Sequence, residues 1–583
     1  MKKYLIKRLA GTLPVLIGVT MLCFTLMTAS GKDPALAVAM RSNSAGDTAL
    51  IASLREEMGL DEPLPARYFL WLKGLLTGDM GKSVVTYHSI TDDIKSFFPV
   101  TFRLVIMAMG WMILIVFPIS MLCARFHNKM IDHIVRLLTI GGICLPVFWL
   151  GFMLLLLFAV RLQIFSVASK AGISGYILPS FALAFPSACG AIRVMRSSLL
   201  SEISSDYAAY ARTRGLSEWQ IILRHGLKNS LPPVITLFSQ YLGYMLAGSA
   251  VAENVFSLKG VGTYLISCVV SGDSPAAAAC IVIIATVFVT ANLTADVINR
   301  LICPWMVRRS MIKKIFSKPQ AVIGLILITI VIICAVFAPV IAPNPPDQID
   351  PSLKYHEADT AYPLGTDQLG RCELSRLIYG ARYSIGMSVP MMLILGVLGL
   401  IIGTFSACAG EKADRIITFI CDVFISFPSL ITAIAVISVL GNGIQNIAAA
   451  VVISMWAWFA RTVRSYAVTE MGKEYITAAR ISGCGTAGLI FRHLIPNILP
   501  QCIVYMSTGV ASAIIMISSF SFLGLGLPQG TAEWGAMMNE ARTGLYSHPE
   551  MLVYPGICIL ITAGGFNLFG EALRDALTSE GGI

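Results

Sequence analysis

Two arginine–histidine pairs stand out among the residues that could bind a partner or take part in chemistry. Arg224-His225 lies in the polar segment DYAAYARTRGLSEWQIILRHGLKN, and Arg492-His493 lies in EYITAARISGCGTAGLIFRHLIPN. A guanidinium binds carboxylates and phosphates through a fixed fork of donors, and an imidazole can donate or accept a hydrogen bond. These pairs indicate polar contacts to a partner. Lipid headgroups are the alternative for the arginines, and capping of a nearby carbonyl is the alternative for the histidines.

Metal and disulfide chemistry are not supported by the spacing of reactive residues. The 14 cysteines are scattered singly, most of them in apolar runs, without a C-x-x-C pair, which is typical of small buried hydrophobic residues. Of the seven histidines, only His88, His356 and His548 fall in segments expected outside the cell, and their wide spacing gives no ligand pattern. We therefore expect no metal site and no cofactor in this chain.

A phosphate-binding loop is also missing from the sequence. The closest string is GDMGKS at 78–83, but a P-loop requires glycine at the position that Leu76 occupies. The string also falls in a segment expected to face outside, where ATP is not supplied. The sequence therefore gives no indication of an ATP-hydrolysing site in this chain.

The elements that position the two Arg-His pairs are predicted to be membrane-spanning helices. The chain has 583 residues, of which 56% are hydrophobic and 13% charged, against about 25% charged in soluble proteins. The net charge of +10 fits basic loops beside membrane spans, and the sequence has no basic, aromatic-interleaved nucleic-acid module. We expect an all-α membrane protein in the lipid bilayer that binds no nucleic acid.

Twelve apolar runs approach the roughly 20 residues needed to cross a bilayer. They form two sets of six, and the fourth run of each set is short or interrupted. The first run is long enough for a retained span, and a cleaved signal peptide ending at TAS is the alternative. The runs lie near 9–30, 100–123, 137–160, 176–192, 232–252, 277–301, 320–342, 384–408, 416–440, 446–460, 500–523 and 552–570.

The distribution of basic residues predicts the orientation of these spans. With the N-terminus inside, the cytoplasmic segments hold more than half of the 43 Lys and Arg residues, as the positive-inside rule requires. Many of the others lie in segment 31–97, a long loop to which the rule applies weakly. Both termini and both Arg-His segments are therefore expected on the cytoplasmic face.

The two polar segments, 206–229 and 474–497, are copies related by an offset of 268 residues, which places Tyr207 on Tyr475. Each half has an even number of spans, so both halves insert the same way up and a pathway between them is expected. The same offset aligns Ala211 with Ala479, Gly215 with Gly483, Arg224 with Arg492, His225 with His493 and Asn229 with Asn497.

Local patterns in the first copy predict two short helices joined by a glycine turn. Apolar residues recur at helical spacing from Leu216 to Leu227, and Ser217 with Gln220 forms a candidate capping box at the start of the second helix. Pro232, and its equivalent Pro500, suit the first turn of the following span, where a missing N–H costs little. Repetition in both halves on one face favours a docking element over a helix lying on lipid.

The copies resemble the cytoplasmic EAA-type coupling loops of ABC importer permeases. In those loops an alanine, a glycine four residues on, and an aliphatic-proline pair follow one another. Lys228 stands where the first copy would have the proline. The matching residues are Ala479, Gly483, Ile495 and Pro496 in the second copy and Ala211, Gly215 and Leu227 in the first.

Over nearly its full length the chain also resembles the peptide/nickel/opine permease family, with its two different permease subunits fused. Departures from the family pattern are Cys372 and Glu571, where aspartate is usual, and Cys303-Pro304 in place of Asp-Pro. The strings that carry the resemblance are GLDEPLPARYFLWLKGLLTGDMGKS, LPSFALAF and ENVFSLKGVG in the first half, and PLGTDQLGRCELSRLIYGARYSI, SFLGLGLPQGTAEWG and FNLFGEALRDAL in the second.

The resemblance implies two tandem six-helix halves of a type I importer permease. The first half covers 1–302, with outer segment 31–97, and the second covers 320–583, with outer segment 343–383. The basic stretch 303–319 is expected to link them on the cytoplasmic side. The location implied is the bacterial cytoplasmic (inner) membrane.

The resemblance also implies the partners. Two separate ATPase subunits would bind ATP and Mg, each receiving one coupling segment, and an extracytoplasmic binding protein would deliver the substrate. The chain itself would be a non-catalytic membrane subunit. The residues expected to couple it to the ATPases are Ala211, Gly215, Arg224, His225, Asn229, Ala479, Gly483, Arg492, His493, Pro496 and Asn497.

The cargo and the pathway are less closely defined by the sequence. Di- or oligopeptides are the first choice, and nickel or a metal chelate is the alternative. Acidic residues within membrane spans usually mark a functional site. Asp296 and Asp422 are therefore candidates for the transport pathway, and helix–helix hydrogen bonding is the other interpretation. An ion-coupled secondary transporter is a distant alternative, because that class predicts central carboxylates and no docking loops.

Overall fold

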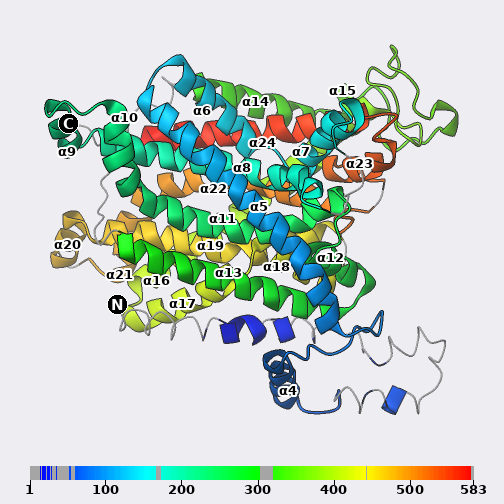
Figure 1. Cartoon of the computed structure of the whole chain (residues 1–583), viewed down its shortest axis with the longest axis horizontal. Coiled ribbons are helices and arrows are strands. Elements are labelled where there is room, and N and C mark those ends of the chain that lie inside the picture. Colours follow the sequence, from blue (N-terminus) through cyan, green and yellow to red (C-terminus); the bar gives the residue numbers. More distant parts are fainter. Residues whose placement is uncertain are drawn as a thin grey trace.

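The computed structural model describes residues 60–165, 172–302, 319–441, 443–482, 484–528 and 530–578, together with scattered residues between 14 and 55. Within these residues every regular element is a helix and no strand is present. The long helices run side by side along the molecule (Figure 1). This arrangement confirms the predicted all-α membrane fold.

Twelve predicted spans have counterparts among the described helices. Seven helices are long and apolar enough to cross a bilayer, two bent helix pairs each make one more span, and three shorter apolar helices match the rest. In the first half they are a helix within Leu16–Thr25, α5 (Ile90–Arg125), α6 (Met130–Ile143) with α7 (Val147–Leu154), α8 (Ser174–Ile203), α11 (Leu227–Val255) and α13 (Ser274–Ile302). In the second half they are α14 (Pro319–Val336), α16 (Glu373–Cys408), α17 (Glu411–Ile425) with α18 (Ser429–Leu440), α19 (Ile444–Met471), α22 (Ile495–Phe522) and α24 (Glu550–Thr578).

The third span of each half is broken. The chain bends by 108° between α6 and the segment that begins with α7, and by 84° between α17 and α18. Pro146 and Pro428 stand at the start of the second arms, where proline removes a helix donor and restricts the residue before it. The expectation of an interrupted fourth span was wrong, because α8 and α19 are continuous over 30 and 28 residues, and α8 accommodates two prolines in its interior.

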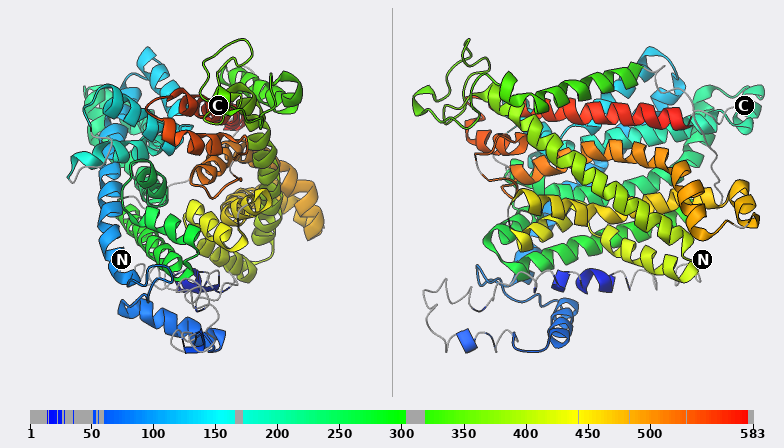
Figure 2. Two further views of the ribbon diagram at one scale, coloured as in Figure 1. Left: turned by 90° about the vertical axis from the view of Figure 1, so that its right-hand side faces the viewer. Right: turned by 180° about the vertical axis from the view of Figure 1, so that it is seen from behind.

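The two halves pack in the same way and reach into each other. In each half the second span packs along the fourth, α5 on α8 and α16 on α19, and the fifth packs along the sixth, α11 on α13 and α22 on α24. Helices α6 and α7 of the first half contact α24 of the second, while α18 of the second contacts α11 and α12 (Val261–Ser271) of the first. Figure 2 shows the resulting bundle along and across its long axis.

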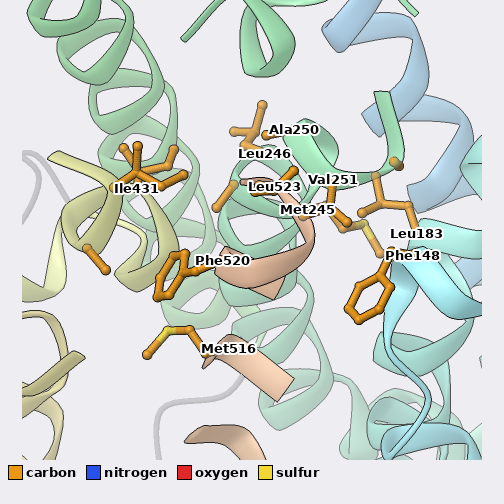
Figure 3. Packing of buried hydrophobic residues seen from close by; sticks show 14 of the residues in the cluster. Phe148, Leu183, Met245, Leu246, Ala250, Val251, Ile431, Met516, Phe520 and Leu523 are labelled. Carbon is orange, nitrogen blue, oxygen red and sulfur yellow. The ribbon is translucent and has the colours of Figure 1, made fainter. Parts of the chain in front are cut away.

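Apolar side chains of both halves form one continuous core (Figure 3). Within this core the rings of Phe148 and Phe522 are fully buried and stack at a centroid distance of 4.8 Å with 10° between their planes. Because one ring comes from each half, the space between the halves at this level is filled by side chains.

Short elements lie at the two ends of the bundle (Figure 1). One end, called here the α9/α20 end, carries α9 (Asp206–Thr213), α10 (Glu218–Ile221), α20 (Glu474–Ile481) and α21 (Thr486–Gly488). The opposite end, called the α12/α23 end, carries α12, α15 (Ala338–Ile341) and α23 (Trp534–Ala541). The remaining short elements are α4 (Leu64–Thr77), the π-helical segments η1 (Leu155–Arg161), η2 (Ile222–Gly226) and η4 (Leu489–Leu494), and the 3-10 turns η3 (Pro351–Leu353) and η5 (Arg542–Gly544).

Replacing Gly262 by alanine is expected to destabilise the contact between α12 and α11. A Cβ atom at Gly262 would lie 2.4 Å from the Cα atom of Ala250, and overpacking of this kind costs about 1–3 kcal/mol. The melting temperature of the purified protein in detergent measures the effect. Gly110→Ala is the matched control, because a Cβ atom there meets nothing within 4 Å; equal melting temperatures for the two variants would contradict the prediction.

Candidate functional site

The first polar segment folds as two helices joined at Gly215. Its φ of +82° lies in the left-handed region that only glycine adopts easily, and it lets the chain turn sharply between α9 and α10. The predicted capping box is confirmed: Gln220 N donates to Ser217 Oγ at 3.4 Å, and Ser217 N donates to Gln220 Oε1 at 2.9 Å. The turn geometry therefore follows from three residues of this segment.

A small apolar core holds these two helices together. The side chains of Ala208, Ala211 and Ile221 are buried against one another, with Tyr207 and Leu216 packed beside them. Ala211 is 7% exposed, and its small side chain allows α9 to pack closely against α10. Its equivalent Ala479 lies in α20 and is half-buried.

Each Arg-His pair lies in a π-helical turn that the sequence patterns did not predict. Arg224 and His225 fall in η2, and Arg492 and His493 fall in η4. Both arginines and His225 are exposed, and His493 is half-buried. A π-turn inserts one residue into a helix without ending it, so α10 continues through η2 into α11, and α21 continues through η4 into α22.

This continuity corrects the expected position of two prolines. Pro232 and Pro500 lie inside α11 and α22, and not in the first turn of a new helix, because the preceding short helix runs directly into the span. The continuous helices extend over Glu218–Val255 and Thr486–Phe522. Pro496 lies in the first turn of α22, directly after the π-turn, and is exposed.

A hydrogen-bond network ties α9 to the spans on both sides of it. The hydroxyl of Tyr207 donates to Glu202 Oε2 at 2.6 Å, and Asn229 Nδ2 donates to Tyr207 Oη at 3.2 Å and to Glu202 Oε2 at 3.3 Å. Burial raises the pKa of Tyr207, and the hydrogen bond to Glu202 raises it further. The phenol therefore stays protonated near neutral pH and keeps donating to the carboxylate.

The second copy repeats this network. The hydroxyl of Tyr475 donates to Glu470 Oε1 at 2.7 Å and accepts from Asn497 Nδ2 at 3.1 Å, while Lys473 Nζ lies 2.8 Å from the same carboxylate oxygen. Burial and the contact with Glu470 raise the pKa of Tyr475 as well. Asn497 also donates to the carbonyl of His493 at 2.6 Å.

Glu202 and Glu470 were missed by the sequence reasoning. They are separated by the same 268 residues as the other matched pairs, so the repeat held the signal that would have found them. The networks assign Asn229 and Asn497 to contacts within the chain. Among the predicted residues, Arg224 and Arg492 are exposed in both segments.

Matched ion pairs anchor the spans from which the two segments emerge. Arg196 of α8 donates from Nε and Nη2 to the fully buried Asp132 of α6, at 2.5 and 2.6 Å. Arg464 of α19 forms the same bidentate pair with Asp414 of α17, at 2.5 Å for both contacts. In each half the first arm of the broken third span is therefore locked to the fourth span.

The remaining candidates lie as follows. Gly483, and the side chain of Asp296 in α13, fall outside the described residues. Asp422 of α17 is partly exposed and accepts from Arg461 Nη1 at 2.5 Å, so the structure gives it a partner within its own half, and its place in a pathway stays a prediction. In the described part of the chain no three His, Cys, Asp or Glu side chains converge as a metal site.

The fold and these paired segments define a membrane transport subunit. The family model for binding-protein-dependent transport system inner membrane components matches the chain twice, over residues 116–308 and 383–579, and the chain belongs to this family. A model for the N-terminal part of such components matches 1–105, and a model for the N-terminal membrane domain of oligopeptide transport permease C matches 307–358. The protein is a permease of an ABC importer.

Individual relatives each align with about half of the chain and nearly all of themselves. The nickel transport system permease protein NikC of Escherichia coli K12 is 34% identical over 255 residues, 44% of this chain and 92% of its own length. The dipeptide transport system permease protein DppC of Alkalihalophilus pseudofirmus is 35% identical over 280 residues, which are 47% of this chain and 90% of its own length. The glutathione transport system permease protein GsiC of Pectobacterium atrosepticum is 34% identical over 304 residues, which are 52% of this chain and 98% of its own length. The chain therefore contains two such permeases fused in one polypeptide.

Replacing Tyr207 by phenylalanine is expected to loosen α9 without unfolding the spans. The variant leaves the Glu202 carboxylate and the Asn229 amide without the hydroxyl between them, and a hydrogen bond to a charged group contributes about 1.5–3 kcal/mol. Amide hydrogen exchange within α9 should become about tenfold faster or more. Tyr210→Phe is the control on the same helix, because Tyr210 is 65% exposed; equal exchange in both variants would show that the network does not hold α9.

Proposed function

We propose that each of the two polar segments docks one separate ATPase subunit, and that an extracytoplasmic binding protein delivers cargo to the opposite end of the bundle. In this arrangement the α9/α20 end and both termini face the cytoplasm, residues 1–302 and 320–583 form the two halves, and ATP and Mg are bound by the partner subunits. The chain itself hydrolyses nothing and moves the cargo between its halves.

The observation that carries this proposal is the continuity between each segment and a long span. Glu218–Val255 and Thr486–Phe522 run without a break from the α9/α20 end into the core between the halves. A force applied at the exposed start of such a helix is transmitted along it as a rigid body. Two ATPases that approach each other beneath the bundle would thereby move both fifth spans.

Exposed arginines provide the polar contacts of the proposed docking surface. Arg224 and Arg492 lie at equivalent exposed positions on the two continuous helices, where a guanidinium fork can bind a carboxylate on an ATPase. His225 and His493 lie beside them, with their ring centroids 6.2 Å and 6.5 Å from those of Tyr207 and Tyr475. We propose the arginines as the direct contacts and the tyrosine networks as the supports behind them.

The two docking surfaces are not equivalent. In the first segment Arg212 Nε forms an ion pair with Glu218 Oε1 at 2.6 Å, which links α9 to α10. The equivalent Arg480 in the second segment lies against the sulfur of Met471 at 3.9 Å. With Lys228 in one copy and Pro496 in the other, we propose that two different ATPase surfaces, or one surface in two arrangements, are accommodated.

Peptides are the proposed cargo, with nickel or a metal chelate as the alternative. Relatives of both kinds align with the chain, among them the dipeptide and nickel permeases and the metal-staphylopine import permease CntC of Staphylococcus aureus. An ion-coupled secondary transporter is disfavoured, because the family model for binding-protein-dependent permeases matches both halves and because Asp132, Asp414 and Asp422 are each paired with an arginine. A carboxylate held in such a pair is not available to bind and release a coupling ion.

Arg492→Glu and Arg224→Glu are each expected to reduce ATP-driven uptake about tenfold or more, since a charge reversal opposes a carboxylate partner. Uptake by proteoliposomes that hold this chain with its ATPases and binding protein measures the effect, and ATP hydrolysis measured in the same vesicles should continue without transport. Lys412→Glu, which reverses an exposed charge at the start of α17, should transport normally. Normal uptake by both arginine variants would remove the docking role.

The binding protein that works with this chain is expected to bind di- or oligopeptides more tightly than nickel chelates. Selectivity in such importers lies mostly in that protein, as the resemblance implies. Calorimetric titration of the purified binding protein with both ligand classes measures the preference. Tighter binding of a nickel chelate would replace the proposed cargo by the alternative and leave the permease assignment unchanged.

A further inference from the structure

A small cavity opens at the α12/α23 end of the second half, away from the two docking segments. It lies between the loop that precedes α16, the first turn of α16, helix α23 and the turn before α24. Its volume is about 20 Å³, which is room for about one group of water size. The charged residues that line it include Asp367, Glu373, Arg376 and Glu540.

Two of the carboxylates near the cavity are fully engaged by two arginines. Arg371 donates from Nε to Asp367 Oδ2 at 2.6 Å and from Nη2 to Glu540 Oε2 at 2.5 Å. Arg376 donates to the same Glu540 oxygen at 3.2 Å and to the carbonyl of Gly530 at 3.1 Å. Both guanidinium groups are buried, so two positive charges are balanced by two negative charges.

Glu373 is a third carboxylate without such a partner. Its residue is 2% exposed, and its Oε1 atom is buried with no hydrogen-bond donor in reach. A buried charge is stable only when it is paired and hydrogen-bonded. Because the arginine donors are used elsewhere and Glu373 lines the cavity, a donor placed in that cavity would lie beside this carboxyl group.

The shape and chemistry of the cavity restrict what that donor can be. Its volume is too small for the planar fork of a second guanidinium, and no converging set of three metal-ligating side chains exists in the described part of the chain. A primary ammonium is compact and carries three N–H donors and one positive charge. His548 stacks on Tyr355 at a centroid distance of 4.0 Å to form one wall, and both residues are only half-buried, which leaves access from the α12/α23 end.

We propose that the Glu373 cavity is a binding site for a primary ammonium group. The Glu373 carboxylate neutralises the cation and accepts one of its hydrogen bonds. The ammonium comes either from the amino terminus of a small ligand or from a lysine side chain of a docked protein. Neither the site nor its test depends on the proposed coupling to ATPases.

Methylammonium is the probe, and thermal unfolding of the purified full-length chain in lipid nanodiscs is the measurement. A ligand that binds only the folded protein raises its melting temperature with concentration. Methylammonium should therefore stabilise the wild-type chain, while tetramethylammonium, which has the charge but no N–H donor, should not at equal ionic strength. No difference between the two cations would overturn the proposal.

Glu373→Gln keeps the shape of the side chain and removes its charge. The apparent affinity for methylammonium should fall at least about tenfold, as for other truncated buried charge pairs. Glu357→Gln is the matched control, since Glu357 is an exposed carboxylate in the same outer segment and its variant should respond like wild type. Glu373→Asp, which retains the charge, should keep a weaker response and guards against a folding defect in the glutamine variant. An unchanged response of Glu373→Gln would also overturn the proposal.

Two further probes distinguish the sources of the ammonium. Alanylalanine carries the amino group of a small peptide, and Nα-acetyl-lysine methylamide carries that of a protein side chain. Stronger stabilisation by the first would assign the cavity to a small ligand, and stronger stabilisation by the second to a docked protein. N-acetyl-alanylalanine lacks the ammonium and should have no effect, and stabilisation by it equal to that by alanylalanine would contradict an ammonium site.

Discussion

The ion pairs of Arg196 with Asp132 and of Arg464 with Asp414 are the contacts on which the arrangement of both halves depends. Each joins the first arm of a broken third span to the fourth span, whose end leads into a polar segment. Asp132 is fully buried, and loss of one partner from a buried pair costs about 3–5 kcal/mol. The break itself can be tolerated because these bidentate contacts hold the freed arm, and the second arm is then able to reach the other half.

The breaks decide how the halves meet. The bent third spans take part in the contacts between the halves, with α6 and α7 against α24, and α18 against α11 and α12. The stacked rings of Phe148 and Phe522 lie at this crossing. The fifth span of the second half therefore reaches the surface between the halves, because α22 carries Phe522 and α7 carries Phe148.

The two halves share the contacts that hold the polar segments in place, but some of their equivalent arginines have different partners. Both copies keep the Glu–Tyr–Asn network and the Arg–Asp pair. Their equivalent arginines differ elsewhere: Arg193 forms an ion pair with Glu571 of the other half, whereas Arg461 pairs with Asp422 of its own. The contacts that support the two segments are therefore repeated in both halves, while Arg193 and Arg461 take different partners.

The sequence by itself determined the class of protein, the twelve spans, the repeat and the capped glycine turn, because these depend on local composition and on residue spacing. Only the tertiary structure showed the break at Pro146 and Pro428, since a proline inside an apolar run can either bend a helix or be accommodated, as in α8, and packing decides which. It also decided that Asn229 and Asn497 serve internal networks, and that Glu373 is left unpaired. These depend on which side chains meet across large sequence separations, and no local pattern records that.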